Sequence, residues 1–130
     1  MHIKYYFAKT VSCSYEEAVS RVTEELKAEG FGVLTEIDVK STLKKKLDVD
    51  FRKYVILGAC NPQFAYRALS AEDKIGILLP CNVVVQERED GKVEVSAVDP
   101  VGMMQMVDNP ALKDLSQQVQ ERLKKVIDRL

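Results

Sequence analysis

The sequence of 130 residues contains no tryptophan, one histidine, His2, and only three cysteines, Cys13, Cys60 and Cys81. Three widely spaced cysteines do not resemble the dense disulfide frameworks of small secreted domains, so we expect reduced thiols. Because the one histidine is at a terminus, no Cys-His or Ser-His pair can form inside the domain, and the usual hydrolytic sites are unsupported. No cofactor is indicated, and the cysteines supply too few ligands for structural zinc.

The chain also lacks an excess of charge and a long apolar run. Nineteen Lys and Arg balance twenty Asp and Glu, a net charge of −1, whereas binding to a phosphate backbone needs a concentrated basic face. The one basic cluster, residues 40–48, is interpreted as the solvated face of a short helix. Neither a signal peptide nor the roughly 18 apolar residues of a membrane span is present. We therefore expect a cytoplasmic protein that binds neither nucleic acid nor membranes.

What the sequence does have is enough apolar side chain, 46% of its residues, to build one core. We predict a single domain over residues 1–130. Apolar alternation and β-branched or aromatic residues predict strands at residues 3–11, 31–39 and 51–60, from Cys81 onward, and after the tight turn at Asp90 and Gly91. The strand at 31–39 is expected to be half-buried.

Helix boundaries are marked by local chemistry. Ser14 and Glu17 form a capping box before an amphipathic helix that Gly30 ends. The pairs Asn61-Pro62 and Asn109-Pro110 each place a capping side chain before a proline suited to the first helical position. The second pair begins a long amphipathic helix that runs to the end of the chain. Since Pro80 cannot donate to a sheet ladder, residues 73–79 are predicted as a helical turn or an irregular connection.

The resulting order of elements fits an α+β fold. Two long helices, each with one apolar face, need a sheet to cover. We predict an antiparallel sheet of about five strands covered on one face by these two helices.

The pair Cys-Asn occurs twice, as Cys60-Asn61 and Cys81-Asn82. If the third and fourth strands are antiparallel neighbours, the end of one lies beside the start of the other, and the two pairs meet at one edge of the sheet. Cys60 precedes a helix N-terminus, where amides and the helix dipole lower a thiol pKa if the sulfur faces them.

Three interpretations of this edge remain open. In the first, the asparagines have local structural roles and the cysteines are small packed groups. In the second, a small ligand binds in a mostly apolar pocket lined by these residues and closed by Met103 and Met104, with Met106 nearby, because methionine adapts to ligands. In the third, Cys60 and Cys81 serve a thiol-dependent redox or metal-binding function. Whether the protein is an enzyme is left open.

Four segments, "FGVLTEIDV", "ILGACNPQFAYRAL", "GILLPCNVVV" and "AVDPVGMM", together resemble the domain of unknown function 302 family of bacterial and archaeal proteins. The resemblance implies a β-α-β-β-β-β-α core similar to the TATA-binding-protein-like fold class, and a homodimer. It implies no catalytic role for any residue, and a shared fold does not transfer nucleic-acid binding. The family's recurring positions correspond to Cys60, Asn61, Pro62, Ala65, Ala68, Leu69, Leu79, Pro80, Cys81, Asn82, Asp99 and Pro100.

One position departs from the family. Asp48 stands where related chains often carry glycine, which leaves the shape of the turn before the third strand open. A purely structural or interaction role for a homodimer is a further hypothesis. We expect the C-terminal helix or the methionine loop at residues 101–110 to contribute to self-association, because the apolar residues exceed what one sheet face obviously covers.

Overall fold

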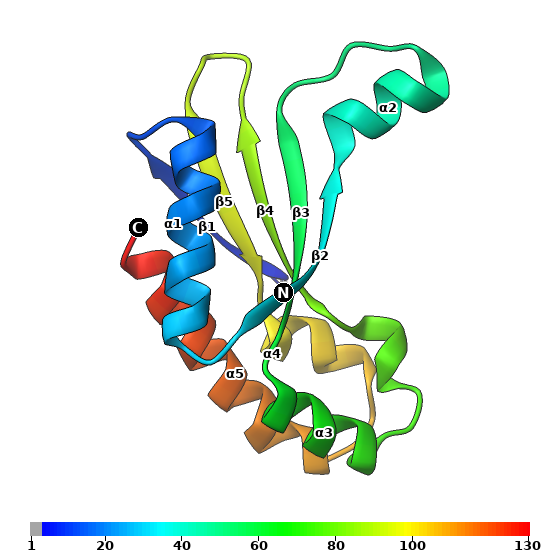
Figure 1. Ribbon diagram of the computed structural model, residues 1–130. Helices are drawn as coiled ribbons and strands as arrows, with labels where there is room; N and C mark the ends of the chain where they lie inside the picture. Colours follow the sequence, from blue (N-terminus) through cyan, green and yellow to red (C-terminus); the bar gives the residue numbers. More distant parts are fainter. Residues whose placement is uncertain (1–3) are drawn as a thin grey trace.

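The computed structural model describes residues 4–130, so the sequence predictions at His2 and Ile3 lie outside the described residues. Strands and helices follow one another along the chain (Figure 1). Their bounds are β1 Tyr6–Val11, α1 Tyr15–Ala28, β2 Gly32–Asp38, α2 Val39–Leu47, β3 Tyr54–Cys60, α3 Pro62–Ala71, η1 Ile75–Leu78, β4 Cys81–Glu87, β5 Val93–Val98, α4 Pro100–Met103, η2 Met104–Met106 and α5 Ala111–Asp128.

The strands form one antiparallel sheet in the order β1-β5-β4-β3-β2. The α+β fold predicted from the sequence is thereby confirmed. β3 and β4 are antiparallel neighbours, with Ala59 opposite Cys81 and Gly58 opposite Asn82. The start of β4 and the end of β3 therefore meet at one end of the sheet.

Helices α1 and α5 cover the same face of the sheet (Figure 1). Ser14 accepts a hydrogen bond from the backbone N–H of Glu17 at 3.1 Å and so begins α1, and Gly30, at φ +86°, follows its end. Along β5, Val93, Val95 and Ala97 are buried beneath these helices, as the alternation predicts. The main core consists of such residues from both layers.

A second, smaller core lies beyond the end of the sheet. Helix α5 continues past the end of the sheet, and its first half packs against α3 and α4 (Figure 1). Ala68, Ile75, Leu112 and Leu115 are buried there. The amide of Asn109 joins the two helices, because its Nδ2 donates to the carbonyl oxygen of Ala71 at 2.9 Å. We call α3, η1, α4 and the first half of α5 the lower lobe.

The expectation of a half-buried strand at 31–39 is wrong for most of its length. β2 is the last strand of the sheet, and only Val33 within it is even partly buried. Leu34 is 69% exposed and Ile37 48% exposed. The strand itself is confirmed, but its register shifts between Val33 and Thr35 and its exposure does not alternate, because an edge strand can stand largely in solvent.

Helix α2 projects from the end of β2 and has no buried residue within the described chain (Figure 1). Its lysines are solvated, as the sequence indicates. Asp48 ends the helix in the left-handed conformation, at φ 52° and ψ 40°. This conformation favours glycine, which explains why a glycine suits this turn. In the described chain, no helix is long and apolar enough to cross a membrane.

Candidate functional site

A cavity of about 360 Å³ lies between the end of the sheet and the lower lobe. Strands β2, β3 and β4 contribute one side of it, and α3, α4 and α5 contribute the other. Its lining is almost entirely apolar, with a few polar groups such as Thr35, Asn61 and Ser116. Volume and lining are those of an ordinary small-molecule pocket.

The structure brings Cys60 and Cys81 together in this lining. β3 ends beside the start of β4, and Cys60 directly follows Ala59, the residue opposite Cys81. Burial, and to a smaller extent the nearby Cys60, raises the pKa of the Cys81 thiol to about 11. A thiol with this pKa remains protonated at neutral pH, whereas the thiolate is the nucleophile and metal ligand.

Asn61 is both a helix cap and a lining residue. Its Oδ1 accepts a hydrogen bond from the backbone N–H of Phe64 at 3.4 Å, and Pro62 takes the first position of α3. The local signal in the sequence was thus correctly interpreted. The side chain is 9% exposed, so it presents a polar amide at an otherwise apolar wall.

Close packing around Gly58 brings together β2, β3 and the connection from η1 to β4. A Cβ placed on Gly58 would overlap Oγ1 of Thr35 and would lie 2.8 Å from Cγ of Pro80. The peptide bond between Leu79 and Pro80 is cis. Thr35, Leu79 and Pro80 all line the cavity. The missing side chain at Gly58 therefore lets the edge strand and this connection approach each other.

Met103 and Met104 line the opposite side, as the ligand-pocket interpretation expects. Asp99 positions them by capping α4: its Oδ1 accepts from the backbone N–H of Val101 at 3.0 Å and of Gly102 at 3.4 Å. Gln120 of α5 donates to the same oxygen at 3.0 Å. This buried carboxylate thus ties the methionine segment to α5.

Two residues considered in the sequence analysis lie elsewhere. Asn82 is exposed and does not line the cavity, because it follows Cys81 in a strand and successive side chains point to opposite faces. Met106 is 73% exposed and is also outside the lining. Of the candidate residues Cys60, Asn61, Cys81, Asn82, Met103 and Met104, all except Asn82 meet at the cavity.

The spacing of apolar residues in the sequence indicates that most of the lining residues belong to the core, without indicating a cavity. The apolar face of α3 was recognised in Phe64, Ala65, Ala68 and Leu69, but nothing in its spacing shows that it faces a cavity. The first turns of α5 likewise contribute Leu112, Leu115, Ser116 and Val119. Bulged Leu34 of β2 was missed altogether, since a bulge gives no helical or strand periodicity.

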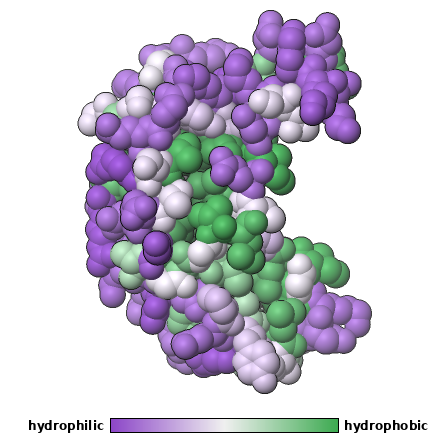
Figure 2. All heavy atoms as spheres, viewed as in Figure 1, coloured by the Kyte–Doolittle hydropathy of each residue, from purple (hydrophilic) through white to green (hydrophobic). Residues whose placement is uncertain are grey.

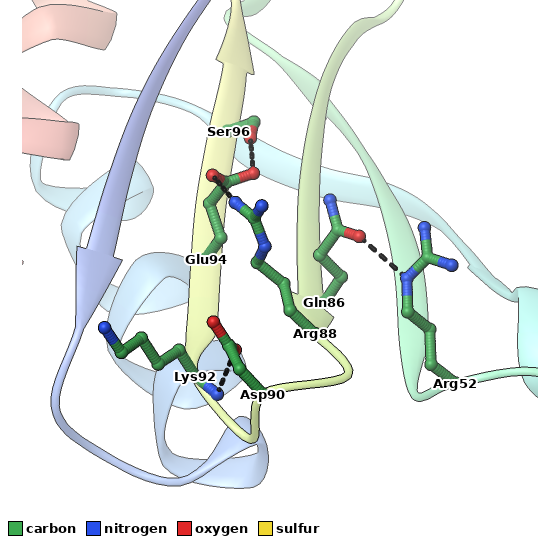
Figure 3. A network of polar contacts seen from close by, with 7 residues as sticks. All are labelled: Arg52, Gln86, Arg88, Asp90, Lys92, Glu94 and Ser96. Atoms are coloured by element: carbon green, nitrogen blue, oxygen red, sulfur yellow. Dashed lines mark hydrogen bonds and ion pairs between the residues drawn. The ribbon is translucent and has the colours of Figure 1, made fainter.

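A second hollow, which is polar, lies at the opposite end of the sheet. Its charged groups already contact one another (Figure 3). Arg88 donates to Oε2 of Glu94 at 2.9 Å, and Arg52 donates to Oε1 of Gln86 at 2.9 Å. We assign no site here, because these contacts explain the arginines. Within residues 4–130, no group of three or more His, Cys, Asp or Glu residues is placed to hold a metal ion.

The fold and cavity define a small α+β protein with an apolar pocket at one end of its sheet. Residues 7–130 match the family model described as "Domain of unknown function DUF302", and the chain belongs to this family. Among solved structures it is similar to the crystal structure of an uncharacterized conserved protein DUF302 from Bacillus stearothermophilus, at 36% sequence identity and a TM-score of 0.89. That comparison covers 96% of this chain and 97% of the other. Comparison with curated proteins finds no match.

Proposed function

We infer that the protein binds a small, mostly apolar molecule in the cavity between the sheet and the lower lobe. The observation that carries this proposal is the lining itself: alkyl, aromatic and thioether side chains surround about 360 Å³, and the amide of Asn61 is one of few polar groups. Such a wall favours a ligand with a hydrocarbon body and one hydrogen-bonding group.

Two features indicate that the cavity is a ligand-binding pocket rather than a gap left by imperfect packing of the core. Met103 and Met104 adapt their shape at low cost, which suits a wall that must close on an added molecule. The cavity also opens toward solvent beside Leu34 and Leu69, which are 69% and 45% exposed. A ligand therefore has a route of entry.

The alternative is a thiol-dependent function of Cys60 and Cys81. The raised pKa of Cys81 disfavours it, because the thiolate needed for exchange or metal binding is scarce at neutral pH. A thiol reagent applied to native protein separates the two hypotheses. Fast labelling of both cysteines at neutral pH would favour the redox hypothesis, and labelling only on unfolding would remove it.

The proposal is tested with the neutral fluorescent probe N-phenyl-1-naphthylamine and two matched variants of α3. Ala65 lines the cavity, whereas Ala71 is exposed at the end of the same helix. We expect saturable binding to the natural protein, at least roughly tenfold weaker binding to Ala65→Phe, and unchanged binding to Ala71→Phe. Absence of saturable binding, or equal binding to both variants, would overturn the proposal.

A further inference from the structure

The outer edge of β2 is open to another strand. β2 pairs with β3 on one side only, and the described chain supplies no strand on the other side. An unpaired edge presents backbone N–H and C=O groups that readily accept another strand. Leu34 and Ile37 add exposed apolar side chains beside these groups.

The other edge of the sheet, β1, is protected. Lys9 of β1 donates to the carbonyl oxygens of Asp128 at 3.1 Å and of Leu130 at 2.6 Å. The end of α5 therefore lies against β1, and a lysine is a common means of blocking an edge. β2 contains no lysine. The bulge in β2 lies between Val33 and Thr35 and leaves residues 35–38 regular, so this part of β2 is the edge open to a further strand.

Two arms project on either side of the β2 edge (Figure 1). The upper arm is α2 with the residues after it, where Leu47 and Val49 are exposed. The lower arm is α3 with η1, where Leu69 and Ile77 are exposed. Figure 2 shows apolar side chains gathered in the hollow between these arms. Exposed apolar side chains that gather in one region of a soluble protein often mark an interaction site.

We propose that a second copy of this chain binds this edge, with the two β2 strands antiparallel across a two-fold axis and α2 of each copy seated on the lower arm of the other. The geometry follows from the direction of β2. The strand begins opposite Cys60, next to the lower arm, and ends at α2. Antiparallel pairing sets the start of one strand beside the end of the other, so each upper arm meets a lower arm.

Charges on the two arms are complementary. Lys45 and Lys46 of α2 are exposed and form no ion pair within the described part of the chain, whereas Lys44 pairs with Asp48 at 2.9 Å. Glu72 and Asp73 lie directly after α3; Glu72 accepts from Nδ2 of Asn109 at 3.1 Å, and Asp73 forms an exposed ion pair with Lys74 at 3.8 Å that a second lysine can join. In the two-fold arrangement, the free lysines of one copy approach these carboxylates of the other.

The second copy fits this surface better than an unrelated peptide strand. A single added strand would cover the edge but would leave Leu47 and Val49 exposed. A two-fold interface covers both arms with the same operation, because each exposed patch meets the other patch on the partner. The seated α2 also borders the cavity mouth at Leu34 and Leu69; this last consequence rests on the proposed ligand-binding function.

The interface is tested by the mass in solution of the natural protein and three variants, measured by analytical ultracentrifugation. Leu47→Glu and Ile37→Lys place charges in the interface, and Tyr6→Lys places one on β1, where Tyr6 is 38% exposed. We expect twice the mass of one chain for the natural protein and Tyr6→Lys at micromolar concentration, and at least roughly tenfold weaker association for the other two. Circular dichroism checks that each variant is folded.

A charge exchange identifies the partner surface. Lys46→Glu should weaken association, and adding Asp73→Lys should restore part of it. A monomeric natural protein, or a dimer that only Tyr6→Lys disrupts, would overturn the proposal. The two proposals can fail separately. If the natural protein is a dimer but does not bind the probe, only the ligand-binding proposal is wrong. If the natural protein is a monomer that binds the probe, only the interface proposal is wrong.

Discussion

Thr35 of the edge strand β2 lies over Gly58 of β3, in the space that a side chain at Gly58 would occupy. Pro80 closes the same space from the other side. The absence of one methyl group therefore determines how closely the edge strand, the β3 end and the connection before β4 pack together.

Replacing Gly58 with alanine is expected to lower the free energy of unfolding by about 1 to 3 kcal/mol, because the added Cβ must displace Thr35 and Pro80. Urea unfolding measures this change. Gly32→Ala is the matched control: an added Cβ there has no atom within 4 Å, so stability should change by less than about 1 kcal/mol. Adding Thr35→Ala to Gly58→Ala should recover part of the loss, and no recovery would contradict the assigned contact.

Asp99→Ala is expected to lower the free energy of unfolding by about 1 to 2 kcal/mol, because α4 loses its cap and Gln120 loses its acceptor. Asp99→Asn keeps an oxygen in the same place and should retain most of the stability. Thermal unfolding of the two variants measures the difference. Equal loss in both would show that the negative charge matters more than the hydrogen-bond acceptor.

Because burial raises the pKa of the Cys81 thiol, we expect the free energy of unfolding to fall at alkaline pH. Its pKa is about 11 in the folded protein and 9.0 as the ordinary value, so between these values the unfolded chain holds fewer protons than the folded one. Stability from this group is complete below pH 9 and is lost as pH rises toward 11, by about 2 to 3 kcal/mol in total.

The measurement is urea unfolding across this pH range in the natural protein and in Cys81→Ala, which should lack this part of the slope. Tyr15, whose pKa burial raises to about 12, contributes to both proteins and cancels in the comparison. Cys13→Ala removes a thiol outside the cavity and serves as the control. An identical slope in natural protein and Cys81→Ala would contradict the predicted burial of Cys81.

Asp48→Gly is expected to raise the free energy of unfolding by up to about 1 kcal/mol, because glycine adopts the left-handed conformation at φ 52° without steric cost. The lost ion pair with Lys44 joins two highly exposed side chains and offsets little of this gain. Asp48→Ala loses the ion pair and keeps the steric cost, so it should be less stable than either. Thermal unfolding of the three proteins gives the order, and an alanine variant as stable as the glycine variant would contradict it.

Local chemistry in the sequence was sufficient for most of the fold. Ser14 and Asn61 begin the helices they were expected to begin, and Pro80 directly precedes the strand that starts at Cys81. Helix caps, prolines and apolar periodicity act over a few neighbouring residues, so the elements they define can be predicted from the local sequence alone. The meeting of Cys60 with Cys81 followed from antiparallel pairing.

The sequence predicts self-association through the C-terminal helix or the methionine loop, which stays a prediction, whereas the surface that we propose for it lies elsewhere. The C-terminal helix was expected to have apolar residues to spare, but Leu123 and Val126 are fully buried against the sheet and Leu112 and Leu115 fill the second core. Exposed apolar side chains gather at β2 and its flanking arms instead. The amphipathic pattern of a helix shows that a face is covered, without showing which element covers it.

The sequence by itself thus determined the strands, the two long helices and the caps that begin α1 and α3, and, once antiparallel pairing is assumed, the end of the sheet where the cysteines meet. Only the tertiary structure decided that α3 and the first half of α5 enclose a cavity there, that Asn82 faces away from it, and that β2 is an open edge. The physical reason is range. Hydrogen bonds of caps and turns join neighbours in the sequence, whereas a cavity and an edge depend on how side chains from distant segments fill space.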